Sequence, residues 1–241
     1  RDGIGVRTDC AVESLAVQDD RVRAVLAHRG ARETLEVERV LVSIGVTGQV
    51  DGLGLETVPR VAVSKGFIQA DAFGATGEPG IYAVGDVAGA PWLAHKASHQ
   101  AMACIERIAG TAGAHAPHAE AIPACTFCHP QVASVGLTEA TARERGHRVR
   151  VGRFPFSGNG KAVATGQEAG FVKTVFDEET GALLGAHMVG DGVTELIQGF
   201  AIGRQLEATE AELMQVVFPH PTLSESMAES VLAAFGRALH G

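Results

Sequence analysis

The stretch Phe218-Pro-His-Pro-Thr-Leu-Ser-Glu225 lies near the end of the 241-residue chain and leads into its last apolar, helix-like segment. Prolines on both sides of His220 restrict the backbone and so limit where the imidazole can lie. Glu225 follows at the expected first turn of the helix, where its carboxylate can hold the ring in one tautomer. An imidazole held in this way is suited to act as a general base.

A second interpretation of the same stretch requires no chemistry. Thr222 and Glu225 have the Thr-x-x-Glu spacing of a helix capping box, and His220 would then be only a turn residue. Capping explains Glu225, but it does not explain why a histidine stands between two prolines. We therefore favour His220 as a base and Glu225 as its orienting partner. Pro221 also permits a cis peptide bond after His220.

The composition is that of an ordinary globular protein, with 46% hydrophobic and 20% charged residues. Because the net charge is −8 and no basic run occurs, nucleic acid is not expected as a partner. No apolar run approaches the roughly 18 residues of a membrane span, and the N-terminus lacks the pattern of a secretory signal. We therefore expect a cytoplasmic protein without a membrane partner.

The pair Cys125-Thr-Phe-Cys128 has the spacing of a redox disulfide or of half a zinc site. A zinc site requires further soft ligands, but Cys10 and Cys104 stand alone in the sequence. A redox pair is expected at the start of a helix, whereas this pair lies in the β-rich run 122–129. We therefore favour structural cysteines over redox-active ones.

The first part of the chain is predicted to be rich in strands. Three short β runs at 11–17, 22–27 and 34–37 are separated by polar turns and predict an antiparallel meander. The apolar run 40–45 ends in a glycine and is expected to form a buried strand of an α/β sheet. The glycine-rich segment 47–59 indicates a crossing into another domain.

A possible ligand site follows this crossing. A strand is expected at 66–70, and the run Ile81-Tyr-Ala-Val-Gly-Asp-Val-Ala-Gly89 predicts a buried strand that ends by presenting the Asp86 carboxylate. Such a carboxylate accepts hydrogen bonds from sugar-like hydroxyls, although an ordinary turn aspartate has the same pattern. A helix should follow, stopped by Gly110, with an apolar face formed by Ala97, Ala101, Ile105 and Ile108.

The rest of the chain predicts an α+β unit after an exposed linker at 111–119. Strands are expected at 122–129, 131–136, 149–156, 170–176 and 183–189, as one antiparallel sheet. A helix should begin at Thr138-Glu139 and stop at Gly146. Helices at 193–204 and 210–217 are expected to cover one side of the sheet, and Thr209 and Glu212 have capping-box spacing.

Several motifs together resemble one known family. Tyr82-Ala-Val-Gly-Asp86 followed by Leu93-Ala-His-Lys-Ala97, together with His129-Pro-Gln-Val-Ala-Ser-Val-Gly136 and the stretch 218–225, resemble the pyridine nucleotide-disulfide oxidoreductases. The Leu-Ala-His form is similar to that of dihydrolipoamide dehydrogenases. The resemblance implies the cofactors FAD and NAD, a homodimer, and dihydrolipoamide on an acyltransferase subunit of a 2-oxo acid dehydrogenase complex as the substrate.

The resemblance also implies roles for individual residues. His220 would be the catalytic base and Glu225 its orienting carboxylate, with a cis bond between His220 and Pro221. Asp86 would bind the ribityl chain of FAD. The segment Trp92, Leu93, Ala94 and His95 would contact the flavin ring, whereas Gly45 and Val12 would line the nicotinamide site.

The resemblance implies three parts. Residues 1–46 would end the NAD-binding domain, residues 47–118 would form the central, FAD-contacting domain, and residues 119–241 the C-terminal dimerisation (interface) domain. The expected fold is thus an α+β interface domain preceded by the C-terminal parts of α/β nucleotide-binding domains.

The chain lacks two motifs of the family, a G-x-G-x-x-G that opens a βα unit and a C-x-x-x-x-C pair. We therefore expect the isolated chain to be inactive. Two alternatives are a non-catalytic dimerisation module and the same region of a glutathione or mercuric reductase.

Overall fold

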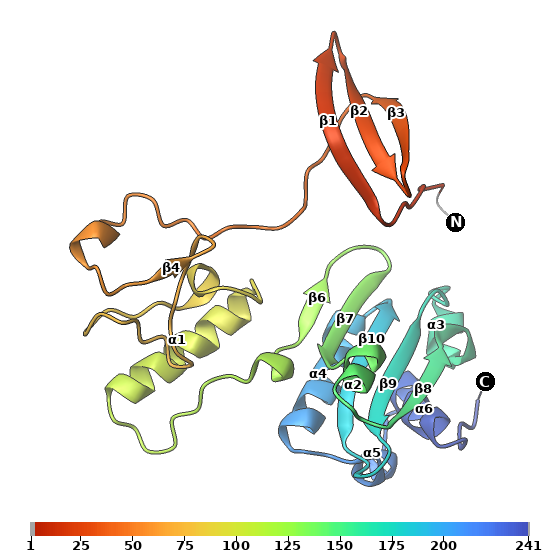
Figure 1. Cartoon of the computed structure of the whole chain (residues 1–241). Coiled ribbons are helices and arrows are strands. Elements are labelled where there is room, and N and C mark those ends of the chain that lie inside the picture. The colour runs from red at the N-terminus through yellow and green to blue at the C-terminus, as the bar shows by residue number, and fades with distance from the viewer. Residues whose placement is uncertain (1–2, 241) are drawn as a thin grey trace. The chain divides into compact units, whose positions relative to one another are not determined.

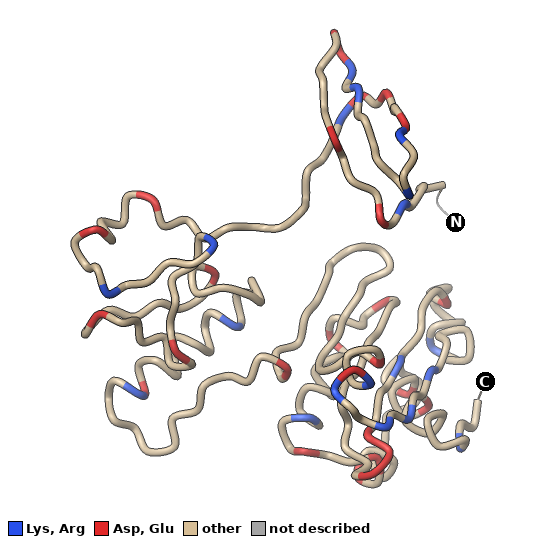
Figure 2. The backbone as a smooth tube through the Cα atoms, viewed as in Figure 1, with Lys and Arg blue, Asp and Glu red and all other residues tan. Residues whose placement is uncertain are grey.

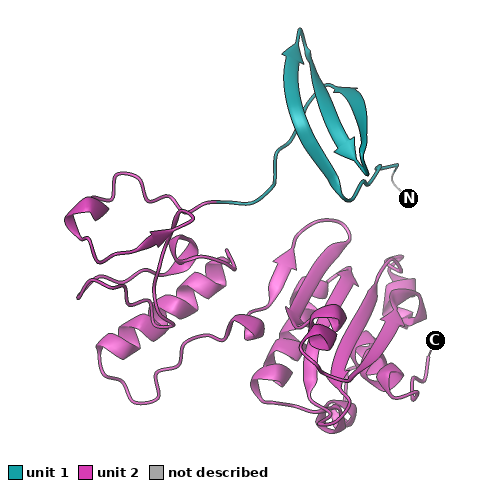
Figure 3. Cartoon of the chain, viewed as in Figure 1, with its two compact units in different colours: residues 1–46 teal, residues 47–241 magenta. Residues whose placement is uncertain are grey.

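An antiparallel meander forms most of the first part of the chain in the computed structural model, which describes residues 3–240. Its strands are β1 (Cys10–Gln18), β2 (Arg21–His28) and β3 (Ala31–Val37), paired in consecutive order. The meander predicted from the three β runs is therefore confirmed. It belongs to a first compact unit, residues 1–46, which is separate from a second unit, residues 47–241 (Figure 3).

The expected buried strand at 40–45 does not form. This segment is irregular, and Leu41 and Ile44 are 92% and 94% exposed. A strand of an α/β sheet is stabilised by paired neighbours and by helices on its faces. In the part of the chain that the structure describes, all paired strands are antiparallel. No described residue covers Leu41 or Ile44, so both side chains are exposed to solvent.

Residues 47–118 contain little regular structure apart from one helix. The elements are η1 (Leu55–Thr57), β4 (Val63–Ser64), β5 (Phe67–Ile68), η2 (Gly85–Ala88) and α1 (Ala94–Ile108). The strand expected at 66–70 is only the two residues of β5, paired with β4. The buried strand expected before Gly85 does not form. Only a single β-bridge between Ala75 and Tyr82 is present at this place.

Helix α1 ends before Gly110, as predicted, but its buried face differs from the predicted one. Ile105 and Ile108 are exposed, whereas Lys96, Ala103 and Cys104 are buried. Ala97 and Ala101 of the predicted face are half-buried, so only the first half of that face packs as predicted. The aliphatic part of a lysine can be buried when its ammonium group finds oxygen partners.

A five-stranded antiparallel sheet forms the centre of the segment 119–240, within the second unit (Figure 1). Its order is β6-β7-β10-β9-β8, with bounds β6 (Ala124–Thr126), β7 (Gln131–Gly136), β8 (Val149–Pro155), β9 (Phe171–Asp177) and β10 (Leu183–Gly190). The sequence therefore predicted every strand of this sheet, with shifts at the ends of β6 and small shifts elsewhere.

Helical elements lie on both faces of this sheet, not on one face as expected. They are η3 (Ala119–Ala121), α2 (Glu139–Glu144), η4 (Phe156–Gly158), α3 (Gly160–Ala164), α4 (Val193–Gln205), α5 (Glu210–Gln215) and α6 (Glu225–Ala234). Side chains alternate along β9, so Val172 and Phe176 join the main core with α4 and α6. Val175 faces the other way and packs with Ala142 of α2 in a smaller cluster.

The backbone of α6 packs closely on the sheet at Gly152 of β8. A Cβ atom at this position would overlap the carbonyl oxygen of Ser230 and lie 2.8 Å from the nitrogen of Ala234. Thr174 of β9 also donates a hydrogen bond of 3.0 Å to the same carbonyl. These contacts fix the helix that begins at Glu225.

Acidic and basic residues are interspersed over the domain at 119–240, with several ion pairs between them (Figure 2). Among the described residues, no helix is long and apolar enough to cross a membrane.

Candidate functional site

The loop before α6 brings His220 and Glu225 together. The Nδ1 atom of His220 lies 2.9 Å from Oε1 of Glu225, so the ring donates its Nδ1 hydrogen to the carboxylate. The His220–Pro221 peptide bond is cis, as expected. This arrangement leaves Nε2 of a neutral ring as the atom that can accept a proton.

The second oxygen of Glu225 holds the loop itself. Oε2 accepts a 2.9 Å hydrogen bond from the backbone nitrogen of Thr222. This contact is the main cause that lowers the pKa of Glu225 below its usual value, and the hydrogen bond from His220 also contributes. The capping box is incomplete because the Thr222 hydroxyl bonds to Pro219 and Ser224, and α6 begins only at Glu225. Glu225 therefore orients the imidazole and braces the turn together.

The imidazole faces open space. The side chain of His220 is 78% exposed, and no described residue makes a hydrogen bond to its Nε2. Val216 and Val217, just before this loop, are also exposed, Val217 at 92%. A proton acceptor beside an exposed apolar pair suits a site that a second molecule completes.

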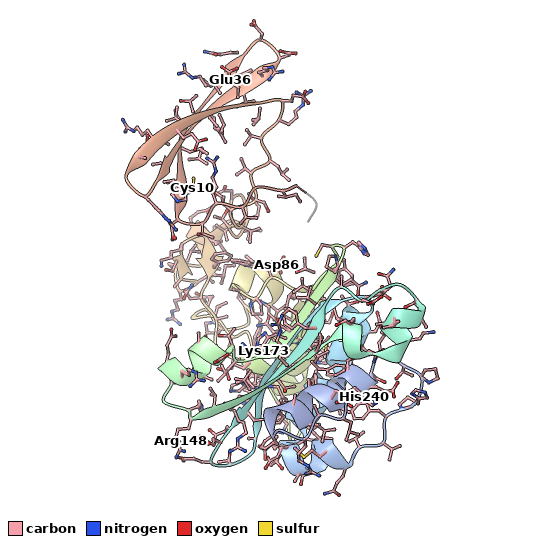
Figure 4. All side chains as sticks on the ribbon, turned by 90° about the vertical axis from the view of Figure 1, so that its right-hand side faces the viewer. Cys10, Glu36, Asp86, Arg148, Lys173 and His240 are labelled. Atoms are coloured by element: carbon pink, nitrogen blue, oxygen red, sulfur yellow. The ribbon has the colours of Figure 1, made fainter. Side chains whose placement is uncertain are left out.

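Asp86 is exposed on the short turn η2, and α1 holds that turn at two points. The ammonium group of Lys96 donates to the carbonyl oxygens of Gly85, at 3.2 Å, and of Gly89. One helical turn later, Gln100 Oε1 accepts the N–H of Gly85 at 3.0 Å. Burial lowers the pKa of Lys96, and the neighbouring charge of Asp86 opposes this effect. The carboxylate of Asp86, which is labelled in Figure 4, is therefore presented on a turn that α1 holds in place.

The segment Trp92–His95 leads into α1, which begins at Ala94. The N-cap residue Leu93 makes no side-chain cap, so the first amide groups of the helix keep their hydrogen-bonding capacity for an electron-rich ligand. The ring of Trp92 stacks on Phe67 with centroids 5.8 Å apart. His95 Nε2 lies 2.7 Å from the carbonyl oxygen of Pro123 and ties the helix to the start of the α+β domain.

Val12 and Gly45 both belong to the first unit. Val12 is exposed in β1, and the pairing of β1 with β2 shifts in register between Val12 and Ser14. Gly45 has a φ of 125° in the irregular segment after the meander, and a Cβ atom at this position would meet nothing within 4 Å. In the described chain, no hydrogen bond joins the 85–95 segment to the His220 pair.

The two cysteines of the CxxC motif are free thiols with different partners. Cys125 in β6 points toward α4, where its sulfur contacts the carbonyl oxygen of Thr194 at 3.8 Å. Cys128 lies in the hairpin loop, 3.1 Å from the carbonyl oxygen of Pro130. Burial raises the pKa of Cys125. Residues 3–240 contain no cluster of three or more groups suited to hold a metal ion.

Sequence reasoning missed three side chains at these sites. Lys96 and Gln100 have the i, i+4 spacing of neighbours on a helix face, which could have signalled a shared role. The third, Asn159, donates to the carbonyl oxygen of Thr222 from 63 residues away, and no sequence pattern indicates this contact. A second histidine–glutamate pair joins Nδ1 of His240, which is labelled in Figure 4, to Glu229 at 2.8 Å.

Two family models match the chain. One is described as pyridine nucleotide-disulphide oxidoreductase, over residues 1–101, and the other as the dimerisation domain of the same family, over residues 122–231. The second model covers the part of the chain that carries His220 and Glu225.

Two of the most similar curated relatives are dihydrolipoyl dehydrogenases. The chain is 53% identical over 239 residues to a dihydrolipoyl dehydrogenase of Zymomonas mobilis, covering 99% of the chain and 51% of the relative. It is 53% identical over 211 residues to that of Rhizobium etli, covering 88% and 44%. The chain thus spans about half the length of the curated relatives that it matches.

The crystal structure of LpdA from Mycobacterium tuberculosis is similar in fold, with a TM-score of 0.82 at 27% identity, over 92% of this chain and 48% of that one.

Proposed function

Because the chain belongs to the pyridine nucleotide-disulphide oxidoreductase family, we propose that it is the C-terminal part of an FAD-dependent dihydrolipoamide:NAD⁺ oxidoreductase. In this proposal residues 1–46 end the NAD-binding domain, residues 47–118 contact FAD, and residues 119–241 form the dimerisation domain. The observation that carries it is the 2.9 Å contact between His220 Nδ1 and Glu225 Oε1, with Nε2 open to a substrate.

The proposed task of His220 is to move a proton at Nε2. A thiol with a pKa of about 8.5 is mostly protonated at neutral pH, whereas only the thiolate attacks a disulfide. His220 takes the proton of one dihydrolipoamide thiol, and the resulting thiolate attacks one sulfur of a disulfide, which breaks the S–S bond and forms a mixed disulfide. The second substrate thiol then loses its proton and attacks the mixed disulfide, so that the lipoamide disulfide closes. The attacked disulfide is left as a dithiol that holds the two electrons and two protons given up by the substrate. Glu225 keeps the imidazole oriented and stabilises its charged form.

The residues of the 85–95 segment fit the proposed flavin. Asp86 offers an exposed carboxylate to hydroxyl groups, and the start of α1 offers uncapped N–H groups to an electron-rich ring. Bound FAD would supply the two-electron acceptor between the disulfide and NAD⁺. Val12 and Gly45 stay as proposed neighbours of NAD.

The attacked disulfide is proposed to come from a second subunit. The chain carries the family's dimerisation domain, and the exposed Val216 and Val217 beside His220 support an interface at the base. In a two-fold dimer each subunit can place its base next to the disulfide of the other. The proposed physiological partner is the lipoyl group on an acyltransferase subunit of a 2-oxo acid dehydrogenase complex.

A reconstitution experiment tests this function. The chain is mixed or fused with the N-terminal half of the Zymomonas mobilis relative, and flavin absorbance and NADH formation from dihydrolipoamide are measured. We expect flavin uptake and turnover for the combination and neither for the chain alone. Flavin uptake with activity only on glutathione disulfide or mercuric ion would contradict the lipoamide assignment. A folded combination that takes up no flavin would indicate a non-catalytic dimerisation module.

A further inference from the structure

The peptide segment of Thr222 is held from both sides. Its N–H donates to Glu225 Oε2 at 2.9 Å, and its carbonyl oxygen accepts a 3.0 Å hydrogen bond from Asn159 Nδ2. Thr222 follows the histidine–proline pair directly, so these two bonds set the path of the backbone between His220 and Glu225.

Asn159 is itself fixed. Its side chain is buried, with the residue only 3% exposed, and Oδ1 accepts the N–H of Ala162 at 3.0 Å as the N-cap of α3. Both ends of the amide are thus engaged, and the Nδ2 donor cannot turn away without breaking the cap. A buried amide with both groups bonded is a rigid attachment point.

The imidazole depends on this attachment because few other contacts restrain it. His220 is mostly exposed, and Glu225 is its hydrogen-bond partner among the described residues. The loop is also held by the bonds of the Thr222 hydroxyl to Pro219 and Ser224, and by Phe218 and Leu223, which pack against the main core. Leu223 lies over Gly192. Leu223 fixes how closely the loop lies to the main core, but its side chain makes no hydrogen bond to the peptide groups of the loop.

We propose that Asn159 is a positioning residue. It holds the Thr222 carbonyl oxygen and thereby keeps the His220 imidazole in place for its hydrogen bond to Glu225. This inference rests on the proposed role of His220 as a base. Without the Nδ2 donor, the Thr222 carbonyl loses its partner in a half-buried site. The peptide then rotates toward water, the N–H contact to Glu225 weakens, and the ring loses its fixed orientation.

Asn159→Asp separates the two functions of the side chain. Aspartate keeps an oxygen for the N-cap of α3 but has no hydrogen to donate to Thr222. Asn159→Ser also keeps a cap and is too short to reach Thr222, so it replaces the first variant if that one does not fold. The matched control is Thr138→Val, which removes the N-cap of α2 on the opposite face of the sheet.

The primary readout is the tautomer of His220 in the 241-residue chain, measured from the ¹⁵N shifts of labelled histidines above about pH 8, where imidazole is neutral. His220→Gln assigns the signal. We expect the Nδ1–H tautomer to dominate in the unmodified chain and in Thr138→Val. In the Asn159 variants this tautomer should lose its dominance. An unchanged tautomer in both Asn159 variants would overturn the positioning role.

Kinetics of the reconstituted enzyme separate this inference from the proposed function. We expect Asn159→Asp to lower dihydrolipoamide oxidation about 10- to 100-fold, through kcat more than KM, and to add nothing in a His220→Gln background. If His220→Gln is as active as the unmodified enzyme, the base assignment fails. If His220→Gln is inactive but both Asn159 variants keep full rate, only the positioning role fails.

Discussion

Glu225 accepts the Nδ1 hydrogen of His220 with one oxygen and the N–H of Thr222 with the other, each at 2.9 Å. One carboxylate thus orients the ring and braces the loop that carries it. Because the helix α6 begins at this same residue, the position of the imidazole is tied to the packing of the domain core.

Replacing Glu225 by Gln should affect stability and rate together. A glutamine oxygen can serve one of the two donors at full strength, and the charge that strengthens both bonds is lost. We expect the free energy of unfolding to fall by about 1 to 2 kcal/mol and dihydrolipoamide oxidation to slow at least about tenfold. Urea unfolding and turnover measure the two effects.

The matched control is Glu212→Gln, since Glu212 accepts the Thr209 N–H in the capping box of α5. It should lower stability without slowing the proton transfer. An equal loss of rate in both variants would show that Glu225 acts only through stability.

Gly152→Ala should loosen α6. The new methyl group would overlap the carbonyl oxygen of Ser230, so the helix has to shift away from β8. We expect a loss of about 1 to 3 kcal/mol in the free energy of unfolding. Gly160→Ala is the control, because nothing lies within 4 Å of a Cβ at that position in α3. Similar unfolding curves for the two variants would contradict the close packing of α6.

The free energy of unfolding should decrease as the pH is lowered, because Asp177 takes up a proton. Backbone hydrogen bonding from Thr180, then the contact with His147, lowers the pKa of this carboxyl from 3.8 to about 2. The folded state therefore binds this proton less readily than the unfolded chain. The stabilisation, on the order of 1 to 2 kcal/mol, is complete above about pH 4 and is lost as the pH falls toward 2.

Urea unfolding between pH 5 and pH 2.5 would measure this effect. Asp177→Asn should flatten the dependence over that window, whereas Asp20→Asn, at an exposed position of the first unit, should leave it unchanged. A dependence as steep in Asp177→Asn as in the unmodified chain would exclude Asp177 as its source.

Val217→Asp should weaken the proposed dimer. Val217 is an exposed apolar side chain next to the loop of His220, and a carboxylate there would lose its water on association. We expect a dimer of the unmodified chain at micromolar concentration and a monomer for Val217→Asp, by sedimentation equilibrium. Val17→Asp, on the exposed face of β1, serves as the control. A monomeric unmodified chain would contradict the proposed homodimer.

The sequence predicted the α+β domain well because its local patterns agree with its packing. In β9, Val172 and Phe176 face one core and Val175 faces the other, as the alternating side chains of a strand with two covered faces do. The cap of α5 could also be predicted, since Thr209 and Glu212 interact within one turn. The contact between His220 and Glu225 could be predicted for the same reason, because the two residues are only five positions apart in the sequence.

Predictions that depended on distant partners were less successful. The apolar run 40–45 indicates a buried strand only if other strands pair with it, and Ile105 indicates a core face only if something covers it. Lys96 could not be predicted as buried, because the carbonyl oxygens that hold it belong to the turn at 85–89. Asn159 reaches Thr222 across 63 residues, and only the fold brings them together.

The most direct test of the proposed base is the rate at which dihydrolipoamide reduces the flavin of the reconstituted enzyme, followed by stopped-flow absorbance. His220→Gln removes the proton acceptor, and His240→Gln removes the other exposed histidine paired with a glutamate, Glu229. We predict a rate at least about 100-fold lower for His220→Gln, with His240→Gln within about threefold of the unmodified enzyme. Flavin reduction by His220→Gln at nearly the unmodified rate would contradict the role of His220 as the base.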